Sequence, residues 1–212
     1  MRKMLIALTA ASLVLSLSGL AQAAEQHHEK YQSSYVNAFW HSKVTVDSDT
    51  YLRITWYVGA YDNGTDGFFS DAYRDVARCQ VLTGRDRCNY SRALSWYGYT
   101  RRSGVNSFTI DKQLTAGHLD AYYKLYVDKT GELVGRFHIV TDLAGTGDLT
   151  FGRQRYTEHQ GCTTFKYSGK FEYRQATATG TIALGDETAT DLGKTNDANF
   201  GASQFIDISH TC

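Results

Sequence analysis

Apolar and polar residues alternate with a period of two along most of the chain beyond residue 35, and this alternation is its main structural signal. One apolar set falls on the even positions Val36, Ala38, Trp40, Val44 and Val46. Residues 51–61 repeat the pattern, again with apolar side chains on even positions. A β-strand turns successive side chains to opposite faces, so both stretches predict strands with one buried face.

A tight turn between these two stretches predicts a first hairpin. A slip of one residue turns a strand over, so paired residue numbers must sum to an even value if both apolar faces are to share one side. A three-residue loop at residues 48–50 meets this condition and would pair Val44 with Ile54 and Ser42 with Trp56.

A second hairpin is expected between residues 119–127 and 133–139. A three-residue loop at 129–131 would pair Tyr123 with Phe137, and Gly131 suits the left-handed conformation that such loops require at their third position. On the polar face, the same register would set Tyr122 opposite His138, with Asp120 diagonal to that histidine.

Further strands are expected at Phe69 to Leu82, Ser107 to Ile110, Leu149 to Tyr156, Thr163 to Leu184 with a break near Gly169, and Gln204 to Ser209. A weak helical signal covers Asp71 to Arg78, and Ala24 to Ser33 is polar and unpatterned, which indicates disorder. About ten short strands predict an all-β fold, an antiparallel β-sandwich or barrel.

The first 23 residues have the three parts of a cleavable secretory signal. Arg2 and Lys3 precede an apolar run from Met4 to Leu20, and small residues end at Ala23. The run is too short and wrongly flanked for a membrane anchor, so no stable membrane insertion is expected. The pattern predicts a secreted chain, extracellular or periplasmic, with a single β-domain at residues 24–212.

Charge excludes one class of partner. The chain carries 22 Lys and Arg against 22 Asp and Glu, and removal of the signal leaves it slightly acidic. Phosphate binding needs a clustered positive field, so nucleic acid is not expected as a partner.

Four cysteines follow the signal, and an even number in an oxidising compartment predicts two disulfides. Three pairings are possible. Cys79 and Cys88 enclose a short loop around Gly84 that suits a hairpin, which would leave Cys162 to pair with Cys212. No pair of cysteines has the close spacing of a zinc site.

Residues 139–184 contain the run IVTDLAGTGDLTFGRQRY, then Gly161-Cys162, then the alternating YRQATATGT from Tyr173. This stretch resembles uncharacterised secreted bacterial all-β proteins, in which a Gly-Thr turn is followed by an Ala/Thr strand. The resemblance implies export, an all-β fold and a bacterial source, and it supplies no activity or site residues.

Aromatic and arginine residues gather after Cys88, and they are the candidate ligand-binding residues: Tyr90, Arg92, Trp96, Tyr97, Tyr99 and Arg101. Flat rings with donors beside them stack on sugar faces or on the anchors of a protein partner. Some of these rings could instead pack in the core. A second group would stand on the polar faces of the two hairpins: Tyr51, Tyr57, Tyr61, Tyr122 and Tyr126.

The sequence therefore favours a secreted non-enzymatic β-domain that binds a surface glycan or protein, with no cofactor. One alternative is a secreted hydrolase whose acid pair is drawn from Asp120, Asp142, Glu158 and Glu172. Another is a membrane-active protein that assembles amphipathic strands into pores.

Metal binding is not expected. Residues 62–67 gather oxygen ligands around a glycine turn, but Gly64 and Tyr73 stand where a calcium loop needs acidic ligands, which favours a plain hairpin turn. His27, His28 and Glu29 have no evident third anchor.

Overall fold

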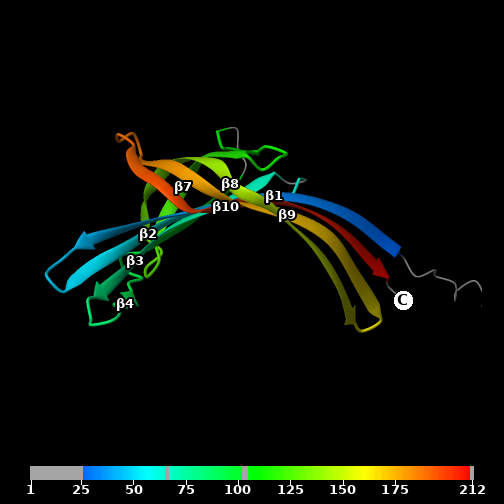
Figure 1. Cartoon of the computed structure of the whole chain (residues 1–212), viewed down its shortest axis with the longest axis horizontal. Coiled ribbons are helices and arrows are strands. Elements are labelled where there is room, and N and C mark those ends of the chain that lie inside the picture. The colour runs from blue at the N-terminus through cyan, green and yellow to red at the C-terminus, as the bar shows by residue number, and fades with distance from the viewer. Residues whose placement is uncertain (1–25, 65–66, 102–104, 211–212) are drawn as a thin grey trace, which may run out of the picture. The chain divides into compact units, whose positions relative to one another are not determined.

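The structure is a computed structural model that describes residues 26–210 except 65–66 and 102–104. The predicted signal and Cys212 lie outside the described residues. The described chain is all-β, with ten strands and no helix (Figure 1). This confirms the predicted fold class and the approximate number of strands.

The strands have these bounds: β1 Gln26–Thr45, β2 Thr50–Asp62, β3 Phe68–Gln80, β4 Arg87–Tyr90, β5 Trp96–Arg101, β6 Ser107–Ile110, β7 Ala116–Val127, β8 Leu133–Gln160, β9 Thr163–Leu184 and β10 Thr190–His210.

The chain divides into two compact units. The larger unit comprises residues 31–153 and 170–204, and the smaller comprises residues 154–169 with stretches from both ends of the chain. Strands β8, β9 and β10 contribute residues to both units. The expectation of a single domain at 24–212 stays a prediction.

All ten strands belong to one sheet. Its hydrogen-bonded order is β2-β1-β10-β9-β8-β7-β5-β3-β4, and β6 pairs with β7. Strand β2 also pairs with β3, which closes the path into a ring of eight strands. The pairing is therefore that of a barrel-type sheet and not of two separate sheets.

The interior of the ring is filled by one face of each strand. Even positions of β1, β2 and β3 and odd positions of β7 and β8 supply the core, as the period-two alternation predicts. The largest buried side chains include Tyr123, Phe200 and Leu119. The Tyr123 hydroxyl lies 2.6 Å from the Ser70 hydroxyl, which donates to the Gly59 carbonyl oxygen, so these buried polar groups are paired.

The register of the first hairpin differs from the prediction by two residues. Val44 pairs with Leu52 and Ser42 with Ile54, not with Ile54 and Trp56. The backbone N–H groups of residues 46 and 47 both bond to the Thr50 carbonyl oxygen, and the N–H of residue 49 bonds to the preceding aspartate side chain. This local turn moves the loop back by one residue. Because the shift in register is even, the predicted faces are kept.

The second hairpin has the predicted register. Tyr123 pairs with Phe137, and Gly131 adopts a left-handed φ of 71°. A β-bulge follows at Leu125 and Tyr126, next to the turn.

Three local predictions are wrong. Asp71 to Arg78 is part of strand β3, because its alternate residues fit the core of the ring and so override its helical propensity. Strand β9 continues past Gly169 without the predicted break. Strand β1 begins at Gln26, within the segment predicted to be disordered.

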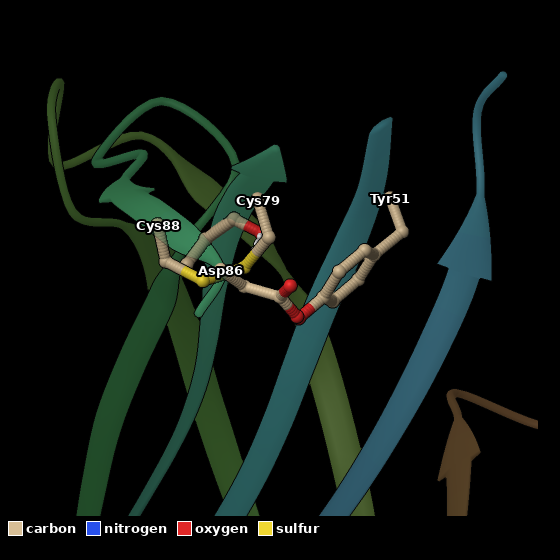
Figure 2. The surroundings of a disulfide bond; sticks show 5 residues. Tyr51, Cys79, Asp86 and Cys88 are labelled. Atoms are coloured by element: carbon tan, nitrogen blue, oxygen red, sulfur yellow. Dashed lines mark hydrogen bonds between the residues drawn. A yellow bond between two sulfur atoms is a disulfide. The ribbon is translucent and has the colours of Figure 1, made fainter. Parts of the chain in front are cut away.

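The predicted disulfide between Cys79 and Cys88 is present (Figure 2). The two residues lie directly opposite each other in the pairing of β3 with β4. Beside this bridge, the Tyr51 hydroxyl donates to the Asp86 carboxylate at 2.6 Å (Figure 2). The predicted bond from Cys162 to Cys212 stays a prediction, because Cys212 lies outside the described residues.

Over the part of the chain that the structure describes, no helix is long and apolar enough to cross a membrane.

The first prediction concerns this disulfide. Replacing both Cys79 and Cys88 with Ala should lower the free energy of unfolding by about 2–3 kcal/mol, because the bridge limits the entropy of the unfolded loop. Denaturant titration of both proteins measures the change. An unchanged denaturation midpoint would contradict the expectation.

A second prediction concerns Gly98, where β5 crosses close to β7. A Cβ there would overlap the Lys124 carbonyl oxygen and lie 2.7 Å from the Leu125 side chain. Gly98→Ala should destabilise the protein by about 1–3 kcal/mol or more, because backbone has to move. The matched control is Gly117→Ala, whose Cβ would meet its neighbours at 3.5 Å or more. Equal melting temperatures for the two variants would show that β5 and β7 are not this close.

Candidate binding surface

Strand β5 carries three of the predicted binding aromatics and turns them to opposite faces. Trp96 and Gly98 face the interior, and Tyr97 and Tyr99 face outward. The Trp96 ring lies 6.1 Å from Trp56 and 5.7 Å from Phe137. Trp96 therefore packs against the core and does not share a surface with the two tyrosines.

An arginine that the sequence analysis did not select covers Trp96. The Arg74 guanidinium lies 4.5 Å from the centre of the Trp96 ring and 6.0 Å from that of Trp56. It donates to the Leu94 carbonyl oxygen at 2.8 Å, and burial lowers its pKa. The cation and the two indoles stabilise each other at this site. Only the three-dimensional pairing of β2, β3 and β5 brings them together.

Tyr97 and Tyr99 are exposed, with 45% and 62% of their surface accessible. The Tyr97 ring lies 6.2 Å from Tyr126 on β7, and the Tyr99 ring is stacked 6.0 Å from Phe69 on β3. Thus the structure joins Tyr97 of the cluster after Cys88 to Tyr126 of the second hairpin, two groups that the sequence analysis treated separately.

Tyr97 and Tyr126 end a row of aromatic residues that crosses five neighbouring strands. Each member pairs with the next in register across β1, β2, β3, β5 and β7: Phe39, Tyr57, Tyr73, Tyr97 and Tyr126. Ring centres lie 4.8 Å apart for the first pair and 4.3 Å for the second. The period-two pattern places each ring on the outer face, but the row depends on the register between strands.

A half-buried polar cluster lies beside this row. The Tyr57 hydroxyl donates to the Asn37 side chain at 2.8 Å, and its ring extends over Gly59, where any Cβ would overlap the hydroxyl. Burial raises the pKa of the Asp71 carboxyl and of the Tyr57 hydroxyl next to it. The polar atoms of this cluster are hydrogen-bonded to one another, so polar groups border the row of aromatic rings.

An open groove of about 500 Å³ begins at Tyr99 and Tyr126. Strands β5 and β7 pair at only two positions, and beyond them the Asn106 side chain spans the gap, donating to Thr100 at 2.9 Å and accepting from the Tyr122 N–H at 3.0 Å. We call this the aromatic groove; it is lined by Tyr99, Thr100, Val105, Asn106, Tyr122, Tyr123, Lys124, Tyr126 and Arg136.

The face of β7 and β8 forms one wall of the aromatic groove. Tyr122 and His138 are stacked at 4.3 Å, and His138 Nε2 lies 2.7 Å from the Asp120 carboxylate, as the predicted register requires. The Arg136 guanidinium also lies 4.7 Å from the centre of the Tyr122 ring. Tyr122 thus contacts both a cation and an imidazole.

A second hollow of about 540 Å³ continues past this wall. It shares Val105, Tyr122 and Arg136 with the aromatic groove and adds Asp120, His138 and Asp186. Lys124 therefore lines only the aromatic groove, the two carboxylates line only the second hollow, and Arg136 lines both.

Tyr90 and Arg92 lie apart from the aromatic groove and bind Asp128. Arg92 Nε donates to that carboxylate at 2.9 Å, and the Tyr90 hydroxyl lies 3.3 Å from it. These bonds, led by that of Arg92, lower the pKa of Asp128. Arg101 ends β5, but its side chain lies outside the described residues.

The acids named for a hydrolase are dispersed or already paired. Asp120 binds His138, and Asp142 lies 2.7 Å from His118. Glu158 belongs to the smaller unit and accepts from Tyr156 and Gln160, whose hydrogen bonds lower its pKa. Glu172 lines a small separate groove with Phe151 and Lys170.

In the described residues, no group of three or more His, Cys, Asp or Glu side chains has the geometry to hold a metal ion. The candidate calcium loop follows β2, and its Asp62 carboxylate accepts from the Gly64 N–H at 2.7 Å. The side chains of His27, His28 and Glu29 lie outside the described residues.

Comparison with known proteins gives little. No family model and no curated protein matches the chain. Among solved structures, the enduracididine biosynthesis enzyme MppR complexed with pyruvate is similar at 9% identity over 92% of both chains, with a TM-score of 0.24. The same enzyme complexed with the condensation product of pyruvate and imidazole 4-carboxaldehyde is 8% identical over 92% of this chain and 91% of its own, with a TM-score of 0.24. A likeness this slight carries no argument.

The opposite orientations of Trp96 and Tyr97 give a third prediction. Trp96→Ala should lower the free energy of unfolding by about 2–4 kcal/mol, because it opens a cavity among aromatic neighbours. Tyr97→Ala should change it by less than about 1 kcal/mol, since that ring is exposed. Chemical denaturation compares the two. A larger loss for Tyr97→Ala than for Trp96→Ala would mean that β5 faces the other way.

Proposed function

We propose that the protein is a secreted, non-enzymatic β-domain that binds a surface glycan along the aromatic groove. One observation carries this proposal. Beside the buried Tyr123, three more accessible tyrosines from two strands, Tyr99, Tyr122 and Tyr126, line a single open groove together with two cationic side chains.

The chemistry of the groove suits sugars. Tyrosine rings offer an apolar face to the C–H groups of a sugar ring, and their hydroxyls and the neighbouring charged groups offer hydrogen bonds to its hydroxyls. The rings are held in place by their neighbours, as Tyr122 is by Arg136 and His138, so little side-chain freedom is lost on binding. A rigid, open groove also admits a chain longer than one sugar.

Two further observations support a binding role. Large side chains fill the interior of the ring, which leaves the outer surface for a ligand. Two of the four acids named for a hydrolase, Asp120 and Asp142, are each engaged by a histidine. The disulfide between Cys79 and Cys88 supports secretion, because such bonds persist in oxidising compartments.

The fourth prediction tests the groove. A glycan array should identify a ligand for the mature protein, and a double Tyr99→Ala, Tyr126→Ala variant should bind it roughly tenfold or more weakly, because ring stacking is lost. Isothermal titration measures the affinity. Phe151→Ala is the matched control, since Phe151 is an aromatic residue outside the groove with 67% of its surface exposed.

The control should bind as the wild type does, and all three proteins should melt cooperatively. Equal weakening by the groove and control variants would contradict the proposed site. Binding to a purified protein, with no glycan bound at any position of the array, would overturn the proposed ligand class.

A further inference from the structure

Two cations lie side by side on one wall of the aromatic groove. Lys124 on β7 and Arg136 on β8 are direct cross-strand partners, and both side chains are exposed and line the groove. Like charges directly opposite in an antiparallel pair destabilise the sheet. The arrangement therefore costs stability in the free protein.

Within the part of the chain that the structure describes, no carboxylate forms an ion pair with Lys124 or Arg136. The ion pairs there are those of His41, Arg92, His118 and His138, each with an aspartate. Arg136 has the Tyr122 ring as its neighbour, which holds the guanidinium in place without neutralising it. An anion placed between the two cations would remove the repulsion.

Carboxylates line the hollow that adjoins the aromatic groove, and Arg136 lines both. Asp120 and Asp186 line the adjoining hollow, and Asp120 is engaged by His138 at 2.7 Å. Carboxylates accept hydrogen bonds from hydroxyl groups and repel other anions. A fitting ligand thus has an acidic group over Lys124 and Arg136, and hydroxyl groups toward Asp120 and Asp186.

We propose that the ligand is an acidic polysaccharide, whose carboxylate or sulfate group lies between Lys124 and Arg136 while a sugar ring packs on Tyr126. This proposal rests on the proposed function and names its ligand class. The proposed binding requires both the contact with the two cations and the packing on Tyr126. General attraction to a polyanion would require positive charge alone.

The test compares three polysaccharides at physiological salt: polygalacturonate, dextran sulfate and uncharged dextran. The wild type should bind one of the two acidic polymers at least tenfold more tightly than dextran. Which of them binds distinguishes a carboxylate from a sulfate ligand. Lys124→Gln and Arg136→Gln should each weaken that binding about tenfold, as expected when one hydrogen bond to a charged group is lost.

Lys112→Gln is the matched control, because it removes the same charge from an exposed position outside the groove and should leave binding unchanged. Tyr126→Ala should weaken binding to a similar degree as the two charge variants. In the absence of ligand, Lys124→Gln should melt no lower than the wild type at low salt, because it removes a repulsion.

Three outcomes would overturn the proposal. Equal loss of affinity in Lys124→Gln and Lys112→Gln would show that the protein attracts the polymer through its net charge alone. Acidic polymer binding that survives Tyr126→Ala would show a polyanion effect without the groove. Tight binding of dextran that depends on Tyr126 would contradict the acidic ligand but not the proposed function. A glycan array without any ligand would contradict the proposed function itself.

Discussion

The closure of the sheet through the pairing of β2 with β3 is the constraint on which the rest of the structure depends. In a closed ring, each side chain faces either the interior or the outer surface, and the register of the strands decides which. The interior is occupied by large side chains such as Tyr123 and Phe200. Recognition is therefore left to the outer face, where register fixes the neighbours of every exposed ring.

The candidate site lies at a place in the ring where two neighbouring strands pair over a short length. Strands β5 and β7 share only two paired positions, and Asn106 takes over the hydrogen bonding beyond them. A full ladder there would bring the strands together along their length and fill the groove. The absence of a side chain at Gly98 lets the two strands approach closely just past these paired positions. Gly98, which allows the close approach of the two strands, and Tyr99, which lines the groove, are thus neighbours on β5.

Charged groups are distributed unevenly over the outer surface around the groove. Lys124 and Arg136 line the aromatic groove, and Asp120 and Asp186 line the adjoining hollow together with Arg136. The Tyr122 ring, which contacts Arg136 and His138, belongs to both hollows. The direct cross-strand pairing of Lys124 with Arg136 is the feature that favours an acidic ligand.

Alternation alone was enough to predict the all-β fold, the buried faces and the second hairpin, because those depend on a local period of two. The Cys79–Cys88 bridge followed from its short spacing in the chain. The register of the first hairpin was wrong, since an aspartate turn decides it. The groove was predicted only in part. Tyr99, Tyr122 and Tyr126 were selected, but in two separate groups, and Lys124 and Arg136 were not selected, because no local pattern specifies where β7 and β8 lie relative to β5. Trp96 was selected with them, although alternation turns it to the core.

The measurement that tests the closed ring most directly is the set of nuclear Overhauser contacts between the paired strands β5 and β7. The account predicts backbone contacts between Trp96 and Val127 and between Tyr97 and Tyr126, together with contacts between the rings of the latter pair. Contacts that instead place Tyr97 beside another strand, or Trp96 on the same face as Tyr99, would contradict the closed ring and the groove that depends on it.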